Sequence, residues 1–167
     1  MTDEIYSIPS DNSFIDVTET NETVLDQLKS VITKKVTRSD IFIKVPERPG
    51  VQLLVSPNIT QNQLRAWQKN CGSESKTGLD AVKFACTVIG HTTKGIYLNG
   101  QEVHENGYPL GFASPSVLEM TGTTRAIPEC VQNFFGLDPH LESAALAIID
   151  AAGYGDTIEA EKENPTN

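Results

Sequence analysis

Apolar residues are most concentrated in one segment of the chain, residues 79–92, which has the sequence LDAVKFACTVIGHT. Its charged residues are Asp80 and Lys83. The apolar positions recur at the spacing of an α-helix and cover most of its circumference, which indicates burial on several sides. We therefore expect this helix to be the centre of the core, so that an aspartate in place of Phe84 or Ile89 should unfold the domain.

Further helices are predicted from apolar stripes at helical spacing and from capping residues. They cover residues 23–36, 60–70, 114–122, 124–136 and 138–153. Thr20 and Asn21 are candidate caps of the first of these helices. Thr60 with Gln63 fits a capping box at the start of the second, and Asp138 is the expected cap of the last.

Two β-hairpins are predicted between the helices. The first joins strands at residues 41–45 and 51–55 through a turn rich in breaker residues, PERPG. The second places Asn99-Gly100, the strongest short hairpin signal in the chain, between residues 96–98 and 101–103. The order of the elements predicts an α+β fold: a mainly helical single domain over residues 23–155 with two short β-hairpins.

Both ends of the chain are acidic and poor in apolar residues. Residues 1–22 carry six acidic side chains and no lysine or arginine, and residues 156–167 are similarly polar. Such segments bury too little apolar surface to offset the entropy lost on ordering, so we expect disordered acidic termini. The N-terminal arm is either a solvated tail or a docking peptide for a partner. A small basic patch within residues 34–48 is a candidate contact for these acidic ends.

The overall charge narrows the classes of partner. The formal net charge of −9 argues against nucleic acid and against an anionic membrane surface, because both require clustered lysine and arginine. No apolar run approaches the roughly 20 residues that a membrane span needs, and the first residues do not resemble a signal peptide. Three cysteines at irregular spacing indicate reduced thiols rather than a disulfide framework. We expect a soluble protein of the cytoplasm.

The residues that could carry chemistry do not form a recognised motif. The cysteines and the three histidines lack metal-ligand spacing, and no nucleophile elbow occurs. A spatial pair of Cys71 and His91 is conceivable, but nothing in the sequence requires it. The glycine-containing loop at residues 72–78 lacks the order of a phosphate-binding loop. We therefore predict a non-enzymatic protein with no catalytic, cofactor-binding or metal-binding residues.

Several segments together resemble a family of small proteins encoded by tailed phages of actinobacteria, the siphovirus-type tail assembly chaperones. These segments are RPGVQLLVSPNIT, QNQLRAWQKN, LDAVKFACTVIGHTTKGIYLNGQEV, LGFASPSVLEMTG, FFGLDPH and AALAIIDAAGYG. The resemblance covers roughly residues 41–155. In that family the genes lie between those of the major tail protein and the tape measure protein. The matching segments are structural signatures and not catalytic motifs.

The resemblance implies a function in virion morphogenesis. It implies a chaperone that binds the helical tape measure protein, keeps it soluble, and helps recruit tail tube subunits, including the major tail protein. Such a factor acts in the host cell cytoplasm and is absent from the mature virion. The alternative is a minor structural or connector component of the virion. Self-association of the chain stays open.

A groove between helices would suit weak, repeated binding to an apolar helix. Trp67 is interpreted either as a core anchor, because tryptophan buries a large area, or as a hot spot for a partner. We take Trp67, Phe134 and Phe135 as the candidate residues that line or support this groove.

Overall fold

The structure, a computed structural model, describes residues 22–160. The chain divides into two units, Met1–Thr37 and Arg38–Asn167, and we call the second the compact unit. The predicted acidic arm at residues 1–22 lies outside the described residues except for Glu22, and so does the predicted tail from residue 161 onward. The described residues form a mainly helical α+β fold with small antiparallel sheets, as the sequence predicts.

The first described helix, α2 (Val24–Ile32), belongs to the unit before the compact one. Thr23 caps it: the Thr23 hydroxyl accepts from the Asp26 backbone N–H, and the Asp26 carboxylate accepts from the Thr23 N–H. The cap is thus Thr23 and not Thr20 or Asn21, and the helix ends before the predicted residue 36. None of its residues is buried. The predicted domain 23–155 included this helix, whereas the structure divides the chain after Thr37.

The compact unit contains a four-stranded antiparallel sheet with the order β2-β3-β4-β5. Its strands are β2 (Ile41–Lys44), β3 (Val51–Val55), β4 (Thr93–Leu98) and β5 (Gln101–Glu102). Both predicted hairpins are present, and pairing between β3 and β4 joins them into one sheet. Asn99 and Gly100 both have positive φ angles, 49° and 82°, as a two-residue hairpin turn of the primed type requires.

A second, smaller hairpin follows β5. It consists of β6 (His104–Glu105) and β7 (Tyr108–Pro109), which pair antiparallel around the Asn106-Gly107 turn. This hairpin was not among the two that the sequence predicts, because its strands are too short to show an alternating pattern.

More residues of the compact unit lie in helices than in strands. The helical segments are α3 (Gln61–Asn70), α4 (Ala81–Thr92), α5 (Pro115–Thr121), the short kinked turn η2 (Ala126–Cys130), α6 (Val131–Phe135) and α7 (Asp138–Ala151). The capping box of Thr60 and Gln63 is confirmed. The cap of α7 is Leu137 and not Asp138, because Asp138 already has the first helical position, directly before Pro139.

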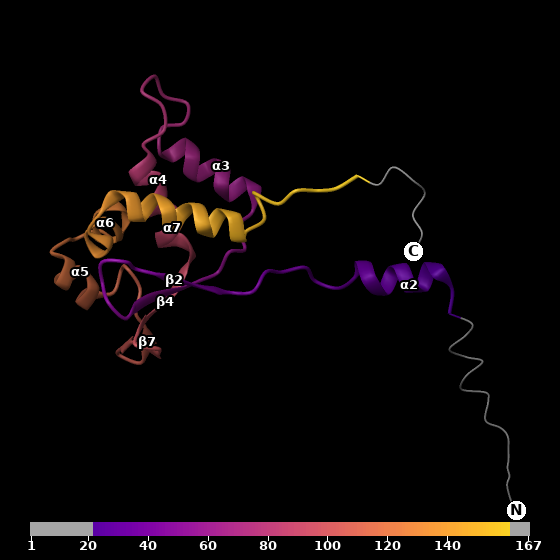
Figure 1. Ribbon diagram of the computed structural model, residues 1–167, viewed down its shortest axis with the longest axis horizontal. Coiled ribbons are helices and arrows are strands. Elements are labelled where there is room, and N and C mark those ends of the chain that lie inside the picture. The colour runs from indigo at the N-terminus through magenta and orange to yellow at the C-terminus, as the bar shows by residue number, and fades with distance from the viewer. Residues whose placement is uncertain (1–21, 161–167) are drawn as a thin grey trace, which may run out of the picture. The chain divides into compact units, whose positions relative to one another are not determined.

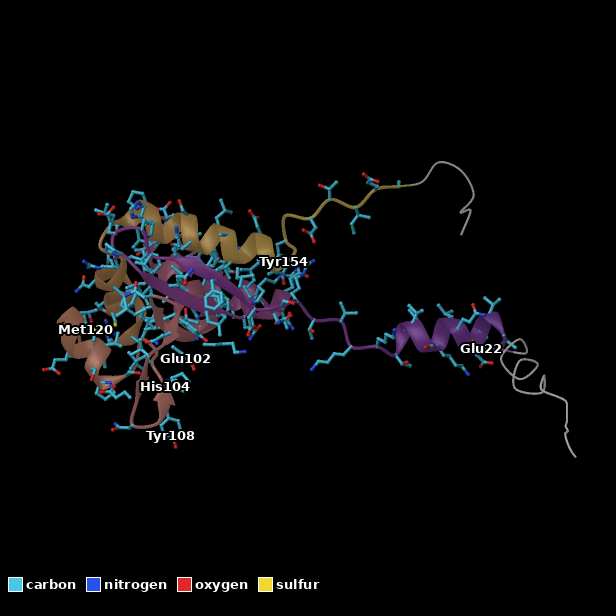
Figure 2. All side chains as sticks on the ribbon, turned by 60° about the horizontal axis from the view of Figure 1, so that its bottom comes forward. Glu22, Glu102, His104, Tyr108, Met120 and Tyr154 are labelled. Atoms are coloured by element: carbon cyan, nitrogen blue, oxygen red, sulfur yellow. The ribbon has the colours of Figure 1, made fainter. Side chains whose placement is uncertain are left out.

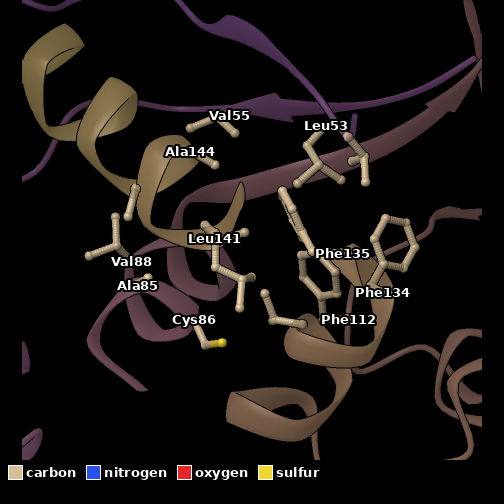
Figure 3. Close-up of a cluster of buried hydrophobic side chains, with 14 of the residues drawn as sticks. Leu53, Val55, Ala85, Cys86, Val88, Phe112, Phe134, Phe135, Leu141 and Ala144 are labelled. Atoms are coloured by element: carbon tan, nitrogen blue, oxygen red, sulfur yellow. The ribbon is translucent and has the colours of Figure 1, made fainter. Parts of the chain in front are cut away.

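The core lies between the sheet and the helices. Figure 1 shows α4, α6 and α7 together on one side of strands β2 and β4. Leu53 and Val55 of β3 point into a cluster with residues of these helices, among them Val88, Phe135 and Leu141 (Figure 3). Helix α4 is central, as predicted, with a run of buried residues from Ala85 to Ile89. Helix α4 therefore forms the centre of the core, and the remaining elements of the compact unit pack around it.

Candidate partner-binding surfaces

Helix α2 presents an apolar stripe that is not buried within its own unit, as far as the structure describes that unit. Figure 2 shows side chains projecting along its length. The exposed fractions of the apolar side chains are high: Val24 80%, Leu25 58%, Leu28 54%, Val31 65% and Ile32 70%. At 100° per residue these five positions lie within one face of the helix, and Asp26 and Ser30 lie opposite. The helix has a side-chain cap at each end: the Thr23 hydroxyl accepts from the Asp26 N–H, and the Thr33 hydroxyl donates to the Lys29 carbonyl.

Trp67 lies on α3 and is partly buried against the core. Its indole stacks on the imidazole of His91, with ring centroids 5.4 Å apart and an interplanar angle of 8°. Both rings line a pocket of about 260 Å³ that also includes Gln63 and Lys94. Trp67 is therefore a core neighbour that also lines a pocket, and its role as a hot spot for a partner stays a prediction.

The two phenylalanines of α6 have different positions. Phe135 is completely buried in the core. Phe134 is 9% exposed, packs edge-on against Phe112 with ring centroids 5.2 Å apart, and lines a shallow groove of about 280 Å³. Met120, which Figure 2 labels, lines the same groove and is 66% exposed. Phe134 thus lines a groove and Phe135 only supports it, while Trp67 lines a different pocket.

Arg48 is a site residue that the sequence did not single out. It lies in the turn between β2 and β3, where its Nε donates to the Phe134 carbonyl and its guanidinium NH2 to the Asn133 carbonyl, both at 2.9 Å. These are carbonyls of the last turn of α6, which have no partner within the helix. Arg48 also lines a second open groove of about 550 Å³, formed with the Asn99-Gly100 turn. One arginine therefore fixes the turn beside two grooves.

The basic patch makes one of the expected contacts with an acidic end. The Arg38 guanidinium donates to the Asp156 carboxylate at 2.7 Å, and the Tyr154 hydroxyl donates to the Ile59 carbonyl at 2.8 Å. These two contacts hold the segment after α7 against the compact unit. An exposed ion pair of this kind contributes little to the free energy of unfolding. Its main effect is to orient the segment that follows α7.

Cys71, Cys86 and His91 have ordinary structural environments. Burial, together with the nearby carboxylates of Asp138 and Asp80, raises the pKa of the Cys86 thiol to about 12. Cys86 is therefore protonated and unreactive at neutral pH. The Cys71 sulfur contacts the Thr87 hydroxyl at 3.6 Å, whereas His91 stacks on Trp67. Within residues 22–160, no three potential ligand residues cluster closely enough to hold a metal ion.

Comparison with known proteins adds little to this geometry. No protein-family model matches the chain, and no curated protein matches it. The crystal structure of the protein YqbN resembles this chain distantly: the sequences are 15% identical, the match covers 72% of this chain and 90% of YqbN, and the TM-score is 0.47. This likeness is too weak to support a functional conclusion. Among the described helices, none combines the length and apolarity that crossing a bilayer requires.

Proposed function

We propose that this protein is a tail assembly chaperone of a tailed phage. It binds the tape measure protein in the host cell cytoplasm, keeps it soluble, and helps bring tail tube subunits to it. The proposal rests on the resemblance of residues 41–155 to that family. The structural observation that supports it is the exposed apolar stripe of α2, a surface suited to covering apolar helix on a partner.

The stripe has the properties of a docking helix. A nine-residue helix is marginal by itself in water, and most helical stability comes from packing an amphipathic face. Each large apolar side chain contributes about 1.5–3 kcal/mol when it moves from water into a fully apolar contact. An apolar face with i, i+3, i+4 and i+7 spacing fits the groove between helices of a partner. The net charge of −9 keeps the resulting complex soluble.

Co-expression with the cognate tape measure protein tests the proposal. We expect the tape measure protein to be insoluble alone and soluble with this chain. Leu28→Glu places a charge at the centre of the stripe and should reduce the recovery of soluble tape measure protein at least tenfold, as the loss of a central apolar contact does.

Ser30→Glu is the matched control, because it introduces the same side chain on the opposite face of α2. It should leave recovery unchanged, and both variants should melt like the wild type because α2 buries none of its residues. A tape measure protein that stays insoluble with the wild-type chain contradicts the proposal. Detection of the chain in purified virions by mass spectrometry would favour the alternative, a structural component.

A further inference from the structure

Strand β2 is one edge of the four-stranded sheet, and half of its backbone groups face outward. Among the described residues, the sheet order places β3 on one side of β2 and no strand on the other. The Val45 N–H donates to the Val51 carbonyl, so this pair is of the hydrogen-bonded type. Because hydrogen-bonded pairs alternate in an antiparallel ladder, Ile43 and Ile41 bond to β3 while Phe42 and Lys44 direct their N–H and C=O groups away from it.

The outward-facing backbone has a defined length. On its N-terminal side the Arg38 backbone is already engaged: its N–H donates to the Asn58 side-chain oxygen at 2.8 Å, and its carbonyl accepts from the Asn58 amide at 2.9 Å. On its C-terminal side Pro46 has no N–H to donate. The free edge therefore runs from Asp40 to Lys44.

The side chains along this edge form a self-complementary pattern. Asp40, Phe42 and Lys44 alternate with the isoleucines and lie on the face of the sheet away from the helices. Phe42 is 51% exposed and packs edge-on against Tyr97, with ring centroids 5.0 Å apart. One carboxylate oxygen of Asp40 accepts from Lys94 at 2.7 Å, which leaves the other oxygen for a second cation.

We propose that two copies of the chain associate through β2, antiparallel and centred on Phe42. In this register Asp40 of each copy lies opposite Lys44 of the other, and the two Phe42 residues lie opposite each other. The contact is isologous, as a two-fold dimer requires, and joins the two sheets into one eight-stranded sheet. The exposed edge strand gains backbone partners, because the unpaired N–H and C=O groups of a sheet edge are a template for pairing with another chain.

Shifted registers fit less well. Moving one strand by two residues in one direction places Asp40 opposite Pro46, which cannot donate. Moving it by two residues in the other direction places Lys44 opposite Arg38, which sets two cations side by side and uses backbone groups that Asn58 already occupies. The register centred on Phe42 pairs opposite charges at both ends. We expect a weak, concentration-dependent dimer, because the paired edge is short.

Charge reversal of the full-length chain tests the pairing by analytical ultracentrifugation over a concentration series. Lys44→Glu leaves two anions per edge, and Asp40→Lys leaves two cations, so each variant alone should self-associate at least tenfold more weakly than the wild type. An equimolar mixture restores opposite charges at both positions, and a heterodimer should form. Lys94→Gln is the control for Asp40→Lys, since it removes the same ion pair within the chain and should leave the dimer intact.

The outcomes separate clearly. A monomeric wild type at every concentration overturns the proposal, as does a Lys44→Glu variant that dimerises normally, or a mixture of two folded variants that stays monomeric. Leu28→Glu should dimerise like the wild type, because α2 takes no part in the pairing. Loss of the dimer in Leu28→Glu would assign self-association to α2 and overturn the β2 interface without affecting the proposed chaperone function.

Discussion

Arg48 illustrates how one exposed side chain fixes a turn to a helix. Its two hydrogen bonds to the end of α6 depend on the planar fork of the guanidinium. Arg48→Lys keeps the charge but cannot reproduce both bonds, so the free energy of unfolding should fall by about 1–2 kcal/mol. Urea denaturation of the wild type and the variant measures this difference.

Arg65→Lys is the matched control for this substitution. Arg65 is exposed on α3, and the same chemical change there should alter the free energy of unfolding by less than about 0.5 kcal/mol. Equal losses in the two variants would show that the contacts of Arg48 contribute nothing specific to stability.

Cys86 gives the compact unit a dependence on alkaline pH. The unfolded thiol loses its proton near its usual pKa of 9.0, whereas the folded thiol keeps it until about pH 12, because burial raises its pKa. Between these values the unfolded state binds fewer protons, so the free energy of unfolding falls as pH rises. The contribution is fully present below pH 9.

Cys86→Ala removes this titration and provides the measurement. The denaturation midpoint should decrease more between pH 8 and pH 10.5 in the wild type than in Cys86→Ala. The other groups that titrate at alkaline pH affect both chains alike. Parallel declines in the two chains would contradict the role assigned to the buried thiol.

At the scale of elements, α4 supports the strongest prediction about stability. Ile89 is completely buried, so Ile89→Asp should prevent the compact unit from folding. Phe84 packs against the core but stays partly exposed, and Phe84→Asp should destabilise less than Ile89→Asp. Circular dichroism and thermal melting of both variants check the order. A Phe84→Asp chain less stable than Ile89→Asp would contradict the burial described for α4.

Capping and turn motifs in the sequence predicted individual elements correctly, but they did not predict which strands pair over long distances in the sequence. The Thr60-Gln63 box and the Asn99-Gly100 turn carry their own hydrogen-bonding geometry, so the sequence is sufficient to place them. The pairing that joins the two hairpins could not be predicted in this way. Strands β3 and β4 are separated in sequence by two helices, and neither strand carries a local signal that it pairs with the other. Gly90 also needed the structure: a Cβ there would lie 2.5 Å from the Ile127 side chain, which explains a glycine within α4.

At the scale of the whole molecule, the candidate site was only partly predictable. Composition identified the large aromatic side chains, but which of them face a groove depends on packing from distant elements. Phe134 and Phe135 are adjacent in sequence, yet one lines a groove and the other is enclosed. The stripe of α2 was visible in the sequence, but its exposure was not, because an apolar stripe ordinarily predicts burial.

The position of Trp67 determines what spectroscopy can observe. It is the one tryptophan of the chain and belongs to the compact unit, as does its stacking partner His91. Indole fluorescence therefore follows the melting of that unit alone, whereas the far-ultraviolet dichroism signal also contains the helicity of α2. The two probes should give transitions that do not coincide, even where the compact unit unfolds in a single cooperative step. A binding partner that orders α2 would bring the two curves together.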